Sequence, residues 1–185
     1  MLHVERVCHD TLPWLISFSL GLEVVHLYEA HLPVRDTDVS HLFYTTIVGL
    51  ELAHRDLTRD IIFLWAGGGR RSMLGLWGPT TTYGRDFHRC HLAFAMSLPE
   101  LLTAGETIRG RGLTCQNFLG EITTEPSVIG WMPSAQLYFS DLDGHSLEFI
   151  ALLDDTPESS FVGPLSAWRK RPNQTMQPTV GRSDA

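Results

Sequence analysis

The order of secondary structure expected from this sequence occurs twice, and this repetition limits the possible folds more than any other feature. One copy begins with a strand-like run at His31 and the other with a similar run at His91, so the copies are 60 residues apart (91 − 31 = 60). In each copy a helix-like run follows, and three more strand-like runs come after it. A repeat with only two copies at this spacing does not indicate a solenoid. It predicts an α+β fold in which two modules complete one another.

Both predicted helices carry recognisable start and stop residues. The first follows Asp36-Thr37-Asp38, which are good N-cap residues, and Gly49 ends it. The second begins at Ser97-Leu98-Pro99-Glu100, a capping box with proline in the first turn, and it ends at Gly110 and Gly112. The apolar residues expected on the buried faces are Val39, Leu42, Phe43 and Ile47 in the first helix and Leu101, Ala104 and Ile108 in the second.

Three strands are expected after each helix, separated by turn-forming residues. In the first copy they are Leu50–Arg55, Ile61–Trp65 and Ser72–Trp77. In the second copy they are Leu113–Leu119, Ala135–Ser140 and Ser146–Leu152.

Alternation along three of these strands separates bulky side chains from residues that could bind a metal. Successive strand side chains point to opposite faces. The bulky residues that share one face are Leu32 and Val34, Leu92 and Phe94, and Leu147 and Phe149. The opposite face of each strand then carries His31, His91 or Glu148. Two imidazoles and one carboxylate form a facial triad that suits zinc, iron, manganese, nickel or cobalt and leaves open positions. Such an ion polarises an oxygen or activates a water.

Each of these residues alone also has an ordinary structural explanation. A single histidine in a strand is more often a surface residue or a satisfied core residue than a ligand. A carboxylate between apolar residues needs a partner or faces water. Their recurrence at equivalent places in the repeat favours the metal site.

The same alternation identifies residues that would surround the metal. Met73, Gly75 and Trp77 share one face of their strand, and Gln136 shares a face with Tyr138, so we expect Met73, Gly75, Trp77 and Gln136 to line a substrate pocket. Tyr138 could orient a substrate oxygen or donate a proton, or it could be an amphipathic core residue. Asp60 could act as a general base, or it could be a solvated strand end.

Charge and cysteine content limit the partners and the compartment. The chain has 14 basic and 21 acidic residues, a net charge of −7, so we expect neither nucleic acid nor an anionic membrane as a partner. Three widely spaced cysteines favour neither a disulfide framework nor a thiolate zinc site, and they suit a reducing cytoplasm. The apolar run over residues 12–28 is too short and interrupted to span a membrane. It also lacks the basic start of a signal peptide.

The chain is expected to have three parts. Residues 1–27 form an N-terminal extension, either a helix packed on the domain or on a partner chain, or a poorly ordered segment. Residues 28–155 form the domain, with modules at 28–80 and 88–155. Residues 156–185 form a polar C-terminal tail, and its composition from Arg169 onward is typical of disorder.

Three segments resemble motifs of the vicinal oxygen chelate superfamily, which includes glyoxalases, extradiol dioxygenases and bleomycin resistance proteins. Two are His31-Leu-Pro-Val and His91-Leu-Ala-Phe, each before a helix. The most specific spans residues 138–148, Tyr-Phe-Ser-Asp-Leu-Asp-Gly-His-Ser-Leu-Glu. It is similar to the superfamily's Tyr-Phe-x-Asp-Pro-Asp-Gly-His-x-x-Glu, with Leu142 in place of proline. Residues 130–135, Gly-Trp-Met-Pro-Ser-Ala, resemble a bacterial lactoylglutathione-lyase-like subgroup.

This resemblance implies a pair of βαβββ modules that form a cup-shaped mixed sheet around one divalent metal ion. It implies His31, His91 and Glu148 as the ligands and a homodimer, sometimes with modules exchanged between chains. It also implies a glyoxalase-like lyase or isomerase for a small oxygen-rich substrate. The chain departs from glyoxalase I at Gly75, where that enzyme usually has a fourth ligand, so water or substrate would take the position. Two alternatives stay open: an extradiol-type dioxygenase and a non-catalytic drug-binding or metabolite-binding protein.

Overall fold

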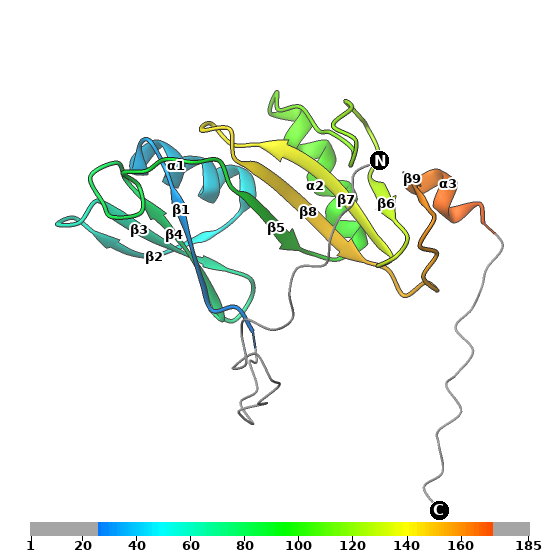
Figure 1. The fold of residues 1–185 in the computed structure, drawn as a ribbon, viewed down its shortest axis with the longest axis horizontal. Coiled ribbons are helices and arrows are strands. Elements are labelled where there is room, and N and C mark those ends of the chain that lie inside the picture. The colour runs from blue at the N-terminus through cyan, green and yellow to red at the C-terminus, as the bar shows by residue number, and fades with distance from the viewer. Residues whose placement is uncertain (1–25, 172–185) are drawn as a thin grey trace, which may run out of the picture.

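The computed structural model describes residues 26–171 and has two mixed β-sheets, each covered by a helix on one face (Figure 1). All of the predicted N-terminal extension except residues 26 and 27 lies outside the described residues. The predicted α+β fold of two βαβββ-like modules is confirmed. A cup closed around a metal is not formed within the described part of one chain.

The first sheet is built as the sequence predicts. Its strands are β1 (Glu29–Pro33), β2 (Glu51–Asp56), β3 (Ile61–Ala66) and β4 (Ser72–Trp77), in the order β1-β4-β3-β2. Strand β1 is parallel to β4, and the other pairs are antiparallel. The parallel pair follows from the helical connection, because a parallel partner needs a crossover rather than a tight turn.

The second sheet repeats this order and adds one strand. Its strands are β5 (His91–Ala95), β6 (Ser127–Ile129), β7 (Ser134–Ser140), β8 (Ser146–Leu152) and β9 (Val162–Pro164), in the order β5-β8-β7-β6-β9. Strand β5 is parallel to β8, as β1 is to β4. The first strand of each module therefore lies beside the last strand of the same module.

The strand predicted over Leu113–Leu119 is wrong. In that segment only Gln116 forms β-bridges, one to Ile122 and one to Tyr138, and neither bridge is part of a strand. The Asn117 side chain accepts hydrogen bonds from the backbone N–H groups of Leu119 and Glu121, which turns the chain instead of extending it. The sheet position is taken by β6, further along the chain, which pairs with β7.

Two elements lie inside the segment predicted to be a polar tail. Strand β9 pairs with β6, and helix α3 (Leu165–Arg169) follows it. The side chains of Leu165 and Trp168 are buried, and the Trp168 indole donates a hydrogen bond to Asp155 at 2.7 Å. The average polarity of this segment concealed two buried apolar residues, which are sufficient to anchor one helical turn.

The first helix begins as predicted but buries a different face. Helix α1 (Thr37–Phe43) has Asp36 as its N-cap, and a wider turn, η2 (Tyr44–Val48), continues it to the left-handed Gly49. Phe43 and Tyr44 are buried, whereas the predicted core residues Val39 and Leu42 are exposed. Thr37 and Ser40 share the buried face of α1 with Phe43, so small polar residues, which a search for hydrophobic periodicity does not select, lie where Val39 and Leu42 were expected. The π-type turn changes the helical period only for the residues after Phe43.

The second helix matches its prediction closely. In α2 (Leu98–Gly110) the side chains and backbone of Ser97 and Glu100 form the predicted capping box, and Leu101 and Ile108 are buried. No helix in the described range 26–171 is long and apolar enough to span a membrane.

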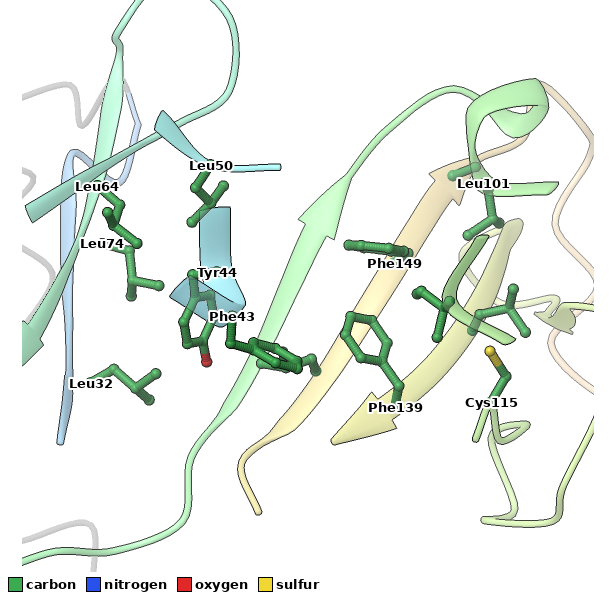
Figure 2. Close-up of a cluster of buried hydrophobic side chains, with 14 of the residues drawn as sticks. Leu32, Phe43, Tyr44, Leu50, Leu64, Leu74, Leu101, Cys115, Phe139 and Phe149 are labelled. Atoms are coloured by element: carbon green, nitrogen blue, oxygen red, sulfur yellow. The ribbon is translucent and has the colours of Figure 1, made fainter. Parts of the chain in front are cut away.

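Both modules share one hydrophobic core. Side chains from both sheets, α1 and α2 form a single buried cluster, in which Phe43 and Tyr44 lie between Leu32 on one side and Phe139 and Phe149 on the other (Figure 2). Because neither sheet buries its bulky face alone, the modules depend on each other for stability.

Hydrogen bonds from the turn between β7 and β8 reinforce this contact. The buried Tyr44 hydroxyl donates to Asp141 at 2.9 Å. Buried His145 accepts from the N–H of Cys90 through Nδ1, so its Nε2 carries the proton and donates to the carbonyl of Pro33 at 2.8 Å. The motif at residues 141–145 therefore joins the two modules.

We expect Tyr44→Phe to lower the free energy of unfolding by about 1.5–3 kcal/mol, because buried Asp141 loses a donor to a charged acceptor. Burial raises the pKa of Tyr44 above its ordinary value of 10, and the negative charge of Asp141 raises it further. Wild-type stability therefore decreases as pH rises above 10, where the unfolded chain ionises and the folded chain does not, and the variant lacks this component.

Urea unfolding between neutral pH and pH 11 measures both effects. Tyr28→Phe, at a half-exposed tyrosine, is the matched control and should unfold like wild type. If Tyr44→Phe and wild type had equal free energies of unfolding at neutral pH, the hydrogen bond from Tyr44 to Asp141 would not stabilise the fold.

Candidate functional site

Two of the three predicted metal ligands lie side by side on the second sheet. His91 on β5 and Glu148 on β8 approach with Nε2 and Oε2 3.1 Å apart. The other ring nitrogen, Nδ1, lies 3.1 Å from the hydroxyl of Ser146, the cross-strand neighbour of His91. Ala93, a small residue, is the cross-strand neighbour of Glu148.

Burial changes the acidity of the groups around Glu148. The Glu148 side chain is 8% exposed, and desolvation raises its pKa despite the opposing effects of His91 and Tyr138. Tyr138 is directly across from Glu148 on β7 and stacks on the His91 ring with centroids 6.1 Å apart. Burial and the Glu148 carboxylate raise the pKa of Tyr138, so its hydroxyl stays protonated at neutral pH.

The third predicted ligand, His31, lies on β1 of the other sheet. Its Nε2 contacts the carboxylate of Glu29, two residues earlier on the same strand face. Its ring packs against Trp77 and Tyr83, with centroid distances of 4.5 and 5.1 Å. Both members of the His31–Glu29 pair are about one-third exposed.

One chain does not bring the three predicted ligands together. Between residues 26 and 171, no group of three or more His, Cys, Asp or Glu side chains is arranged to hold a metal ion. The chain therefore presents two separate histidine–carboxylate pairs, His31 with Glu29 and His91 with Glu148.

Three of the predicted pocket residues share one face beside His31. Gly75 pairs directly with His31, and Met73 and Trp77 are the neighbours of Glu29 and Pro33. A β-carbon at residue 75 would lie 2.8 Å from the indole nitrogen of Trp77 and 3.1 Å from the His31 ring. That indole N–H is buried and has no hydrogen-bond partner in the described residues. The space above Gly75 is thus filled by the Trp77 ring.

Gln136 and Asp60, the other predicted site residues, each form hydrogen bonds with other parts of the chain. Gln136 lies on the predicted face of β7 but is buried, and its amide donates to Ser134. Asp60 accepts a hydrogen bond from Thr37 at 2.7 Å, and its carboxylate occupies the space that a side chain at Gly78 would fill. These contacts place Asp60 at the start of α1, and its predicted role as a general base stays a prediction.

Three contacting residues were missed from the sequence. Glu29 could have been found, because the period of two that selected His31 places residue 29 on the same face. Ser146 was identifiable in the same way from its pairing with His91, once the register was known. Tyr83 lies in a loop without periodicity, so no sequence signal indicates its contact with His31 and Trp77.

Comparison with known proteins identifies the fold. An integron cassette protein from the mobile metagenome of the Halifax Harbour sewage outfall is 29% identical over 70% of this chain and all of its own, with a TM-score of 0.59. A lactoylglutathione lyase from Agrobacterium tumefaciens is 19% identical over 69% of this chain and 94% of its own, with a TM-score of 0.53. A glyoxalase/bleomycin resistance protein/dioxygenase from Nocardioides is 22% identical over 76% and 91%, with a TM-score of 0.54.

The structural neighbours of this chain are members of the glyoxalase/bleomycin resistance/dioxygenase superfamily, and the chain has their fold. No protein-family profile matches the sequence, and no curated protein matches it. The resemblance found in the three sequence motifs is therefore confirmed at the level of fold.

We expect Gly75→Ala to lower the free energy of unfolding by about 1–3 kcal/mol, since its β-carbon would displace the Trp77 indole. Gly68→Ala is the control, because a β-carbon there has no neighbour within 4 Å and its φ is not positive. Urea unfolding with tryptophan fluorescence measures both variants. Equal midpoints for Gly75→Ala and wild type would show that Trp77 moves aside without cost.

Proposed function

We infer that this protein is a divalent-metal-dependent enzyme of the glyoxalase-like lyase or isomerase type, acting on a small oxygen-rich substrate. The observation that carries the inference is the His91–Glu148 pair, an imidazole and a desolvated carboxylate that face each other on adjacent strands. In this proposal His31 from a second copy of the chain completes each metal site, so the active form is a homodimer with two sites.

The spacing of the pair's donor atoms fits a single shared ion. Nitrogen and oxygen ligands at about 2.0–2.2 Å from an ion and at a right angle to each other are about 3 Å apart. Nε2 of His91 and Oε2 of Glu148 are 3.1 Å apart. Ser146, close to Nδ1, orients the imidazole so that Nε2 faces the carboxylate, as partners of metal-binding histidines commonly do.

The edges of both sheets support the assembly of the site from two chains. In the described residues β1 pairs only with β4, and β5 pairs only with β8, so each has one free edge. These two strands carry His31 and His91. A two-fold axis would bring β1 of each chain to the β5 edge of its partner and create two equivalent sites.

Residues of this chain supply the remaining functions that such a reaction needs. When bound, the ion acts as a Lewis acid toward substrate oxygens. Tyr138, neutral at physiological pH, lies against Glu148 and can donate a hydrogen bond or a proton to a substrate oxygen. The rings of Trp77 and Tyr83 beside His31 exclude water from one side of the site. Met73, on the same face, adds apolar surface.

A second candidate function rests on the aromatic surface of the first sheet. Phe63 and Trp77 flank Gly75, and Tyr83 packs edge-on against Trp77 with ring centroids 4.7 Å apart. Such a surface suits a planar aromatic ligand, and it would allow a protein of this fold to sequester a drug or metabolite without metal chemistry. Metal content distinguishes this candidate from the enzyme.

We expect wild-type protein to bind about one divalent ion per chain, and His31→Ala and Glu148→Gln each to lose it, by elemental analysis after dialysis against zinc or cobalt. Co-expression of these two variants with different tags tests the assembly. In the mixed dimer, one site combines both substitutions and the other has all three ligands intact. We therefore expect about one ion per mixed dimer.

If each metal site were formed by a single chain, the mixed dimer would bind no metal, because each of its chains lacks one ligand. That result would overturn the shared site while leaving a metal enzyme. Wild-type protein that takes up no metal would overturn the enzyme proposal and favour sequestration. Glu51→Gln, an exposed carboxylate on β2, serves as the control for nonspecific effects on metal uptake.

A further inference from the structure

The two histidine–carboxylate pairs are alike in the atoms they use. His91 faces Glu148 through Nε2, and His31 faces Glu29 through the same ring nitrogen. In the first pair the carboxylate comes from the neighbouring strand β8, whereas in the second it comes from β1 itself. Each module therefore presents one imidazole and one carboxylate together.

The neighbouring strand of the first module offers no carboxylate, and no room for one. On β4, Gly75 lies directly across from His31, as Ser146 on β8 lies directly across from His91. Two residues further along, where β8 carries Glu148, β4 carries Trp77. The space above Gly75 is filled by Trp77, whose indole nitrogen would lie 2.8 Å from a β-carbon at that position. A carboxylate ligand from the first module would therefore come from a strand other than β4.

We propose that Glu29 is the fourth protein ligand of the metal, moved from β4 to β1 and supplied together with His31. This assignment rests on the proposed metal-dependent function. A carboxylate in contact with Nε2 lies on the side of the imidazole that a metal bound at Nε2 would occupy. A metal held at that nitrogen would therefore lie within reach of Glu29.

The surroundings of Glu29 are consistent with this role. Its only hydrogen-bond partner in the described residues is His31, so its carboxylate has no separate structural task. Its cross-strand neighbour Met73 carries no charge and does not compete for it. With one-third of the side chain exposed, Glu29 can adjust its position without disturbing the core.

The added carboxylate changes what the site can bind. Two imidazoles and two carboxylates would balance the charge of a divalent ion, and on a six-coordinate ion they would leave two positions for other ligands. Two free positions match a substrate that offers two neighbouring oxygens. Three ligands would leave a further position to water.

Cobalt binding to the full-length dimer tests this assignment through affinity and through the visible absorption of the bound ion. We expect Glu29→Gln to weaken cobalt binding by about 10- to 100-fold or more. Loss of a residue that only orients a ligand typically costs about 10- to 100-fold in metal affinity, and loss of a ligand should cost at least as much. When the variant is saturated with cobalt, we also expect the visible absorption bands of the ion to differ from those of wild-type protein, because the ion would have a different set of ligands. Glu51→Gln lies in the same cross-strand row, on the far strand β2, and should match wild type in both measurements.

The outcomes separate this inference from the proposed function. Unchanged affinity and spectrum in Glu29→Gln, with metal lost in His31→Ala and Glu148→Gln, would overturn the role of Glu29 alone. Weaker binding with an unchanged spectrum at saturation would also overturn it, since Glu29 would then only orient His31. A wild-type protein that binds no cobalt would overturn both proposals together.

Discussion

The buried imidazole of His145 fixes the two strands on which the candidate site depends. It accepts from the N–H of Cys90, directly before His91, and donates to the carbonyl of Pro33, two residues after His31. Asp141, at the other end of the same turn, accepts from Tyr44 in the first module. One turn therefore sets the ends of β1 and β5 relative to each other, and an imidazole with both nitrogens engaged in the interior is costly to disturb. The 138–148 motif serves the structure through His145 and the candidate site through Glu148.

The sequence predicted the parts of this structure that local rules control. Strands β4 and β8 begin and end at the predicted residues, and the capping box at Ser97 forms as expected. Predictions failed where a side chain or the tertiary structure overrides the local pattern. Asn117 turns a segment with strand character, and the first helix buries the small polar residues Thr37 and Ser40 in place of Val39 and Leu42. Two apolar residues anchor a segment that is polar on average.

The sequence predicted which face of its strand each candidate residue occupies, but not how these residues assemble. Alternation placed His31, His91 and Glu148 on the correct faces of their strands, because that property depends on neighbouring residues only. Whether strands from different modules meet depends on packing within the chain and between chains, which no local pattern encodes. Glu29 was overlooked because an acidic residue at the start of a strand has an ordinary explanation as a solvated end. The contact of Glu29 with His31 is what makes Glu29 a candidate ligand.

The pairing of each histidine with a carboxylate has a consequence for how the protein would mature. Each imidazole already has an acidic partner, so the metal-free chain keeps its candidate ligands compensated while it folds. Folding then need not wait for an ion, in contrast to small domains that are unfolded without their metal. On the proposals made above, the ion would enter last, when two finished chains meet and protons leave the pairs. The supply of metals at the moment of assembly, more than the fold, would then decide which element the dimer carries.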